Sequence, residues 1–239
     1  MRVAWFSAGV SSFIAAYIAK PDKVIYIDVK EQHPDSMRFV KDCERILGIE
    51  IEVIRDEKYG ASVNTLLERM PFIYGAYGAP CTLHLKKRVR QKWEREHMIE
   101  PITYIWGYDV TEAKRAQRLK DSMIEFKHEF PLIDAQLTKA ECHGICERLG
   151  VKRPIMYEMG YNNNNCVGCV KGGMGYWNKI RIDFPDVFEQ RAKQERIIGH
   201  SCIKGVFLDE LEPNRGRMTD EVMPECGFSC LAIDRDDLS

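Results

Sequence analysis

The sequence predicts an α/β fold in which helices cover both faces of a parallel β-sheet. Short apolar runs at 2–6, 23–28, 49–54 and 102–106 are typical of buried strands. Segments with apolar residues at helical spacing lie between these runs, and this alternation favours a parallel sheet with right-handed crossovers. Ligands of such sheets bind beyond the carboxyl ends of the strands, so the loops there are the first candidates for a site.

Local signals mark where the predicted helices begin and end. Pro21 stops the first helix, and the second is capped by Asp35 and closed by Gly48. Thr138 is the expected N-cap of a helix that runs to Leu149. The other helices are expected at 82–97, 111–126, 174–181 and 185–197, with a short helix around Leu66 and Leu67. The last third of the chain is otherwise expected to be rich in loops.

Charge and hydropathy exclude several classes of protein. The 35 Lys and Arg residues nearly balance the 36 Asp and Glu residues, so no overall positive field exists to hold a polynucleotide or an acidic membrane. No apolar run approaches the roughly 18–20 residues that span a bilayer. The N-terminus has no signal-peptide pattern. We therefore expect a soluble, cytoplasmic protein without a membrane partner.

The nine cysteines separate into two groups. Structural disulfides are not expected, because cytosolic thiols are kept reduced. One group sits at apolar or helical positions and is expected to pack in the core: Cys43, Cys142, Cys146 and Cys202. The other group lies in loops rich in Gly, Pro or Asn and is available for chemistry: Cys81, Cys166, Cys169, Cys226 and Cys230.

A turn of small residues, Ser-Ala-Gly-Val-Ser-Ser at 7–12, joins the first strand to the first helix. Gly9 is expected to adopt a backbone conformation that a side chain would block, and its small neighbours permit close approach. Backbone N–H groups in such a turn, with the helix N-terminus and the hydroxyls, form an anion site. An ordinary turn with a serine N-cap would use the same residues, so both interpretations stay open. Neither Gly-x-Gly-x-x-Gly nor a Walker loop is present.

A Cys-x-x-Cys motif at 166–169 lies in a loop rich in Asn and Gly. Two thiolates at this spacing can converge on one metal, and nearby N–H groups stabilise the charge on sulfur. With Cys81 and the tail pair Cys226 and Cys230, the chain has enough thiols for a 4Fe–4S cluster. A zinc site and a metal-free redox pair share the motif, so all three interpretations stay open.

Basic residues crowd the predicted helix at 82–97. We expect Lys86 or Arg90 to face a pocket and to neutralise a sulfate or phosphate there. A solvated charged face is the ordinary alternative for such a helix, and a nucleic-acid patch is a third interpretation.

Several segments resemble a known superfamily. The turn at 7–12 is similar to the PP-loop, Ser-Gly-Gly-x-Asp-Ser, of the adenine nucleotide alpha hydrolases, with Ala8 in place of a Gly and Ser11 in place of the Asp. The order of the later segments resembles the phosphoadenylyl-sulfate (PAPS) reductase branch, including its short members from bacteria and their viruses. These segments are 26–28 with 32–35, 81–86, 106–108 with Glu112, Arg115 and Arg118, and 224–227.

The resemblance implies a Rossmann-like domain at 1–160 and a cysteine-rich, cluster-binding region at 161–239 packed on the same core. The bound adenine nucleotide would be ATP, adenylyl sulfate (APS) or PAPS. The residues implied to bind it are Ser7, Ala8, Gly9, Val10, Ser11, Ser12, Asp28 and Gly107. Those implied to bind the anionic end of the substrate are Lys86, Arg90 and Arg115. The implied ligands of a 4Fe–4S cluster are Cys81, Cys166, Cys169 and Cys230, with Cys226 as the nucleophile.

Three functions follow from the resemblance. The first is a sulfonucleotide reductase that releases sulfite through Cys226, with a thioredoxin-like electron donor; the two tail cysteines, Cys226 and Cys230, can exchange roles. The second is an ATP pyrophosphatase or adenylating sulfurtransferase, with Mg²⁺, a sulfur donor, and a nucleic acid or small molecule as acceptor. The third is a nucleotide-binding accessory protein without turnover, which Ser11 in place of the Asp favours. A nucleic acid partner is compatible with the second function, but apart from the basic helix at 82–97 no feature of the sequence points to one.

Overall fold

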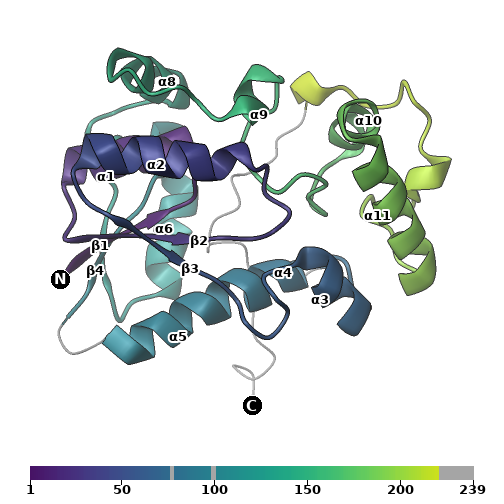
Figure 1. The fold of residues 1–239 in the computed structure, drawn as a ribbon, viewed down its shortest axis with the longest axis horizontal. Helices are drawn as coiled ribbons and strands as arrows, with labels where there is room; N and C mark the ends of the chain where they lie inside the picture. Colours follow the sequence, from purple (N-terminus) through teal and green to yellow (C-terminus); the bar gives the residue numbers. More distant parts are fainter. Residues whose placement is uncertain (76–77, 98–100, 221–239) are drawn as a thin grey trace. The chain divides into compact units, whose positions relative to one another are not determined.

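The computed structural model describes residues 1–75, 78–97 and 101–220, and they form two compact units (Figure 1). Unit 1 comprises the described residues of 1–28, 34–54 and 90–160. Unit 2 comprises those of 29–33, 55–89 and the chain from 161 onward. The sequence predicts a nucleotide-binding region at 1–160 and a cluster-binding region at 161–239. This is a division by function, and it stays a prediction. No helix in the described ranges is long and apolar enough to cross a membrane.

Unit 1 contains a five-stranded, all-parallel sheet in the order β3-β2-β1-β4-β5, which confirms the predicted α/β, Rossmann-like class. The strands are β1 (Arg2–Phe6), β2 (Lys23–Ile27), β3 (Ile51–Ile54), β4 (Thr103–Ile105) and β5 (Lys127–Glu129). The strand order reverses at β1, so the switch point lies between β1 and β4. The polar sequence Lys-His-Glu of β5 carries no apolar strand signal, which is why it was not predicted.

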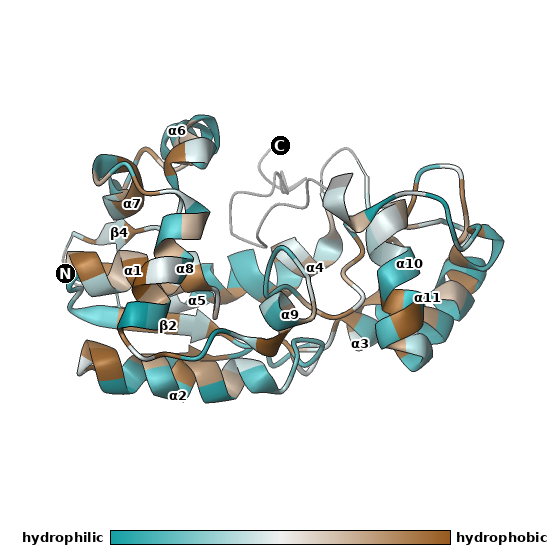
Figure 2. Ribbon diagram, turned by 90° about the horizontal axis from the view of Figure 1, so that it is seen from above, coloured by the Kyte–Doolittle hydropathy of each residue, from teal (hydrophilic) through white to brown (hydrophobic). Residues whose placement is uncertain are grey.

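Side chains of β1 alternate between the two faces of the sheet. Phe6 stacks on Phe39 of α2 (Asp35–Leu47), with ring centroids 6.1 Å apart. Trp5 packs edge to face on Trp93 of α5 (Arg88–His97), with centroids 5.7 Å apart. Figure 2 shows hydrophobic and hydrophilic residues alternating along α2, as a helix with one buried face requires. Both faces of the sheet are therefore covered.

The helices on the α2 side form the main apolar core of unit 1. They are α1 (Val10–Ala19), α2, α7 (Pro131–Asp134) and α8 (Lys139–Arg148), and unit 1 also contains α6 (Ala113–Ser122) and α9 (Ile155–Glu158). Cys43, Cys142 and Cys146 are fully buried in this core, which confirms their predicted packing role. The predicted cap of α8 is also confirmed, because Thr138 Oγ1 accepts from the N–H of Glu141, whose carboxylate accepts in return from the Thr138 N–H at 2.7 Å.

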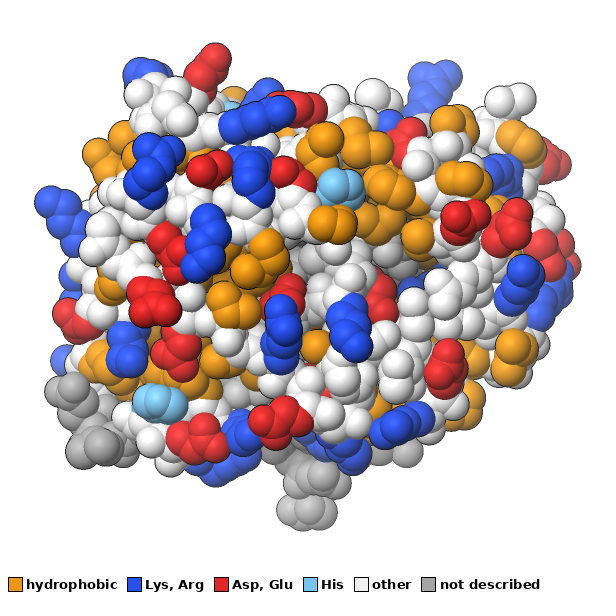
Figure 3. Space-filling model, in the orientation of Figure 1, with side chains coloured by type: hydrophobic (Ala, Val, Ile, Leu, Met, Phe, Trp, Pro, Cys, Tyr) orange, Lys and Arg blue, Asp and Glu red, His pale blue; other side chains and the backbone are white. Residues whose placement is uncertain are grey.

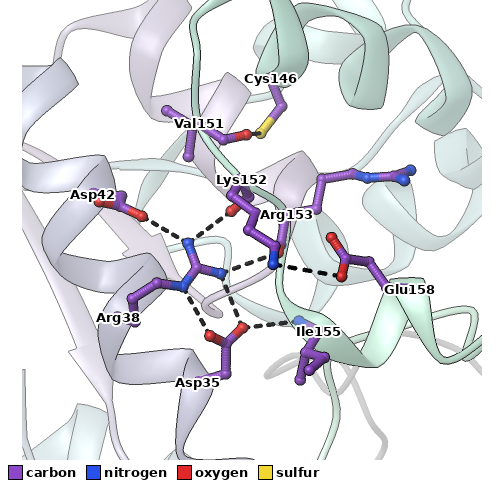
Figure 4. A network of polar contacts seen from close by, with 9 residues as sticks. All are labelled: Asp35, Arg38, Asp42, Cys146, Val151, Lys152, Arg153, Ile155 and Glu158. Carbon is purple, nitrogen blue, oxygen red and sulfur yellow. Dashed lines mark hydrogen bonds and ion pairs between the residues drawn. The ribbon is translucent and has the colours of Figure 1, made fainter.

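The predicted capping role of Asp35 is wrong. Helix α2 begins at Asp35 itself, and the carboxylate accepts hydrogen bonds from Arg38 and from the Ile155 N–H at 2.8 Å (Figure 4). Arg38 also donates to Asp42 at 2.6 Å and to the carbonyls of Lys152 and Arg153. Asp35 therefore takes part in a tertiary hydrogen-bond network instead of capping the helix. This network holds the segment 152–155 against α2.

Unit 2 is built from helices joined by long loops, as the sequence predicts for the last third of the chain. Its helices are α3 (Val63–Arg69), α4 (Pro80–Thr82), α10 (Met174–Asp183) and α11 (Pro185–Ile198). The predicted helix at 82–97 is present, but its first part, Leu83–Lys87, is a π-helical turn, here called η1. Such turns widen a helix locally and recur at functional sites.

Candidate functional site

The loop after β1 is folded around one serine side chain. Ser12 Oγ accepts from the Ser7 N–H at 3.1 Å, lies 2.9 Å from Ser7 Oγ, and donates to the Gly9 carbonyl at 2.9 Å. Gly9 occupies the N-cap position of α1, so the interpretation of this turn as an ordinary serine cap is wrong. Glycine has no side-chain oxygen that could accept hydrogen bonds from the first N–H groups of the helix, and the first turn holds no acidic residue. An anion can therefore accept these hydrogen bonds.

The special backbone position of this loop is Ala8 rather than Gly9. Ala8 has φ 57°, in the left-handed region, and its side chain is fully buried. Gly9 has φ −104° and ψ 157°, which any residue can adopt. The expectation that Gly9 needs a conformation closed to side chains is therefore wrong, and the left-handed alanine makes the turn instead.

The loops after β2 and β4 reach the same edge of the sheet as the loop after β1. A Cβ atom on Gly107 would lie 2.6 Å from the Ser12 Cα, so only glycine permits this close approach. Asp28 follows β2, where its N–H donates to the Ile54 carbonyl at 3.0 Å and its carboxylate accepts from the Tyr26 hydroxyl. The predicted nucleotide-binding residues thus gather at the carboxyl ends of β2, β1 and β4, beside the switch point.

Two of the predicted anion-binding residues, both in unit 1, have carboxylate partners. Arg115 donates to Glu112 at 2.5 Å, and its guanidinium lies over the Tyr108 ring, 5.0 Å from the centroid. Arg90 is buried and forms an ion pair with Glu94 one turn further along α5. The predicted roles of Arg90 and Arg115 in binding the substrate stay predictions.

Three of the predicted cluster ligands line a single cavity in unit 2. The cavity measures about 20 Å³, room for about one water molecule. Its lining includes Cys81, Cys166, Cys169, Lys86, Lys171 and Arg191, with apolar side chains between them. Lys86 belongs to η1, so the π-helical turn and the Cys-x-x-Cys loop both contribute to this wall. We call this cavity the thiol pocket.

A buried tyrosine holds the Cys-x-x-Cys loop in place. The Tyr176 hydroxyl accepts from the Cys169 N–H at 3.0 Å and donates to the Cys166 carbonyl at 3.1 Å. Burial raises the pKa of Tyr176 well above its usual value, so the hydroxyl keeps the proton that it donates. Between the two cysteines, the Val167 N–H donates to the Glu31 carbonyl at 2.8 Å. The loop is therefore fixed at both ends and at its centre.

The one carboxylate that lines the described part of the thiol pocket, Glu31, accepts hydrogen bonds from the N-terminus of a helix. Glu31 accepts from the Ser62 hydroxyl at 2.7 Å and from the N–H groups of Val63 at 2.8 Å and Asn64 at 3.2 Å. These donors form the N-terminus of α3, where a negative charge is stabilised by the helix dipole. Most of the acceptor capacity of Glu31 is thus directed at α3.

Within residues 1–75, 78–97 and 101–220, no group of three or more His, Cys, Asp or Glu side chains is arranged to hold a metal ion. Cys226 and Cys230 lie outside the described residues, so their roles as nucleophile and as fourth cluster ligand stay predictions. Cys202 is buried, as expected for a packing role.

Sequence reasoning missed three residues of the thiol pocket and its support: Tyr176, Glu31 and Arg191. The segments 174–181 and 185–197 carry ordinary helical periodicity, and nothing in that pattern separates a clamp or a pocket-facing cation from a surface residue. The one available signal was proximity, since Tyr176 follows Cys169 by less than two helical turns.

On the face drawn in Figure 3, Lys and Arg side chains are interspersed with Asp and Glu side chains.

The chain matches no protein-family model and no curated protein sequence. Among solved structures, it is similar to the phosphoadenylyl-sulfate (PAPS) reductase from Candida auris in a phosphate complex, at 12% identity and a TM-score of 0.47. The similarity covers 67% of this chain and 78% of that chain. At this identity and TM-score, the roles of individual residues rest on the geometry of the chain itself.

Proposed function

We propose that the chain is an adenine-nucleotide-binding enzyme of the PAPS reductase kind, which carries a thiolate-bound iron–sulfur centre and releases sulfite from a sulfonucleotide. The observation that carries this proposal is the loop at 7–12, which opens α1 at the switch point of the sheet with a glycine at the N-cap. The thiol pocket of unit 2 supplies the second support.

The nucleotide is assigned to unit 1 because three loops there suit its phosphates. The N–H groups at the start of α1 and the hydroxyls of Ser7 and Ser11 are donors, and no acidic residue lies in the first turn of the helix. Gly107 keeps the neighbouring loop close to Ser12 without a side chain between them. Asp28, at the end of β2, is placed to accept hydrogen bonds from hydroxyl or amino groups of the nucleoside.

The iron–sulfur centre is assigned to unit 2 because the residues there fit it in kind. Thiolates are the ligands of iron–sulfur clusters, and three thiols line the thiol pocket, although the described residues alone form no ready-made metal site. A buried guanidinium in the same wall suits an occupant with negative charge. Cys81, Cys166 and Cys169 would hold the cluster, with Cys230 as the fourth ligand. Such a cluster would supply redox and electrostatic chemistry.

The proposed reaction uses Cys226 as a thiolate nucleophile. Its sulfur forms a bond to the sulfur of the sulfonucleotide while the bond to the phosphate oxygen breaks, and the adenine nucleotide leaves with the electron pair. A second thiol, from a thioredoxin-like donor, then attacks the Cys226 sulfur. This step releases sulfite and leaves a mixed disulfide between Cys226 and the donor. The second thiol of the donor then attacks that disulfide, which frees the Cys226 thiolate and leaves the donor as an intramolecular disulfide, so the donor dithiol supplies the two electrons.

The direct test incubates anaerobically purified full-length chain with PAPS, APS and ATP in separate reactions, with a dithiol donor present. Sulfite release supports the proposal. Pyrophosphate release from ATP would assign the chain to the ATP-cleaving alternative, and nucleotide binding without product would make it an accessory protein. Cys226→Ala should keep its iron and lose sulfite release, whereas Cys230→Ala should lose iron. The reverse pattern would exchange the two roles.

A further inference from the structure

Arg191 is a buried cation with no hydrogen bond or ion pair to the described residues, and its charge acts on the neighbouring Cys202 thiol, whose pKa it lowers against the larger effect of burial. It lies on α11 with 2% of its surface exposed, and it lines the thiol pocket. Its Nε and Nη1 atoms are shielded from solvent and form no hydrogen bond. A buried guanidinium normally donates hydrogen bonds to carboxylates, carbonyls or a bound anion, because an unpaired buried charge destabilises the folded chain.

The nearby carboxylates of unit 2 are already engaged elsewhere. Glu195, one turn along α11 and fully buried, accepts from the backbone N–H groups of Cys202 and, at 2.7 Å, of Leu208. Glu31 accepts from the N-terminus of α3, as described above. The described lining of the thiol pocket therefore holds three cationic side chains, Lys86, Lys171 and Arg191, against one carboxylate.

The chemistry of the lining selects the kind of anion. Besides the charged groups, the lining contains the thiols and five larger apolar residues, Val29, Val63, Leu85, Val167 and Val170. A free phosphate or sulfate would find donors on the three cationic side chains, but it is strongly hydrated and would have to give up water against valine and leucine side chains, which offer none. Thiolate sulfur is a soft, polarisable anion, and a metal centre bound by several thiolates carries net negative charge in a compact, weakly hydrated form.

We propose that Arg191 is the counter-charge of a thiolate-bound metal centre in the thiol pocket, and that it raises the affinity of the pocket for metal. This inference rests on the proposed iron–sulfur centre and adds to it a residue outside the expected ligands. In the metal-free chain the described residues offer the Nε and Nη1 atoms no hydrogen-bond acceptor, whereas in the metal-bound chain the guanidinium would face negative charge.

The test measures Co²⁺ affinity of the reduced, chelator-treated full-length chain by competition, with thiolate-to-metal charge-transfer absorption as the signal. Arg191→Met should weaken Co²⁺ binding by about tenfold or more, the usual effect of losing one charge-assisted contact. Arg191→Lys should restore most of the affinity. The matched control is Lys193→Met, which removes a cation from an exposed position on the same helix, 76% exposed in its side chain, and should leave the affinity unchanged.

Thermal unfolding provides a second readout. Without metal, Arg191→Met should unfold at the same temperature as the wild-type chain or higher, because the methionine removes an unpaired buried charge. With Co²⁺ bound, the order should reverse. A variant that is strongly destabilised without metal would show that Arg191 has a protein partner, and would overturn the inference.

The remaining outcomes are also distinct. Wild-type chain that binds no Co²⁺ would remove the metal centre itself, and with it the proposed function. Equal Co²⁺ affinity in wild type and Arg191→Met would overturn the role of Arg191 alone. Inorganic phosphate that binds to the wild-type chain and not to Arg191→Met, with Co²⁺ binding unchanged, would make Arg191 part of an oxyanion site instead.

Discussion

Arg38 in unit 1 is partly buried and Arg191 in unit 2 is almost fully buried, and the two guanidinium groups differ in the partners that they have. Arg38, with a third of its side chain exposed, donates to Asp35, to Asp42 and to two carbonyls. The hydrogen bond to Asp35 raises the pKa of Arg38 above its usual value. Arg191 is far more buried and has no such partner among the described residues. The Arg38 guanidinium is thus satisfied by groups of unit 1 itself, whereas we propose that Arg191 takes its counter-charge from a ligand of the thiol pocket.

The largest effect is expected from Gly107→Ala in unit 1. The added Cβ would lie 2.6 Å from the Cα and 2.7 Å from the N of Ser12, and a backbone atom cannot move aside as a side chain can. We expect a loss of about 3 kcal/mol in the free energy of unfolding, typical of severe overpacking, and loss of adenine nucleotide binding. Chemical denaturation and calorimetric titration with AMP measure the two effects.

Gly144→Ala is the matched control for Gly107→Ala. Gly144 lies within α8, where the nearest group to an added Cβ is the flexible end of Arg148 at 3.5 Å. Alanine should raise the free energy of unfolding here by about 0.5 kcal/mol, because it is the better helix former. Equal stability of the two variants would contradict the close contact between Gly107 and Ser12.

The second largest effect is expected from Gly168→Ala in the Cys-x-x-Cys loop. Gly168 has φ +72°, and its added Cβ would lie 2.5 Å from a methyl group of Val187. Gly199 has φ +74° with open space around it, so Gly199→Ala carries the backbone strain alone. We expect losses of about 2 kcal/mol for Gly168→Ala and about 1 kcal/mol for Gly199→Ala. Only the Gly168 variant should also lose metal affinity. Equal metal affinity in Gly168→Ala and in the wild-type chain would contradict a role of the Cys-x-x-Cys loop in metal binding.

A moderate effect is expected from Arg38→Met, which sharpens the contrast with Arg191→Met. Removal of the guanidinium leaves Asp35 and two carbonyls with fewer donors, at an expected cost of about 1–2 kcal/mol after allowance for solvent exposure. Lys41→Met, on an exposed face of the same helix, should leave the free energy of unfolding almost unchanged, because an exposed ion pair contributes little. The Arg38 effect should be the same with and without metal, and a metal-dependent effect would contradict the contrast.

The smallest effect at neutral pH is expected at His143, because its contribution to stability changes only on the acid side of the profile. Burial, followed by the charges of Arg153 and Lys139, lowers the pKa of His143 from 6.5 to about 4. The unfolded chain binds this proton more readily, so the stability contributed by neutral His143 is complete above about pH 6.5 and is lost as the pH falls towards 4. His143→Gln should flatten that part of the profile. A His143 pKa at or above its usual value, measured by NMR titration, would contradict this.

Much of the fold was readable from the sequence, because the central strands are apolar runs and the helices have clear signals. The β1, β2 and β4 loops and the pocket thiols were also predictable, since residue type and position relative to the strands identify them. Ala8 in place of Gly9 as the left-handed residue was not, because the turn is set by the packing around Ser12. Arg191 was not predictable either. Whether a cation is left without a partner depends on which carboxylates the folded chain has already used.

The most direct test of the central claim is the iron and acid-labile sulfide content of the anaerobically purified full-length chain. The account predicts about four iron and four sulfide per chain in the wild type, and their loss in Cys166→Ser, since a serine oxygen is a poorer ligand for this soft site. The Lys193→Met variant should keep both. Stoichiometric zinc without sulfide, or a chain with neither metal, would contradict the iron–sulfur centre.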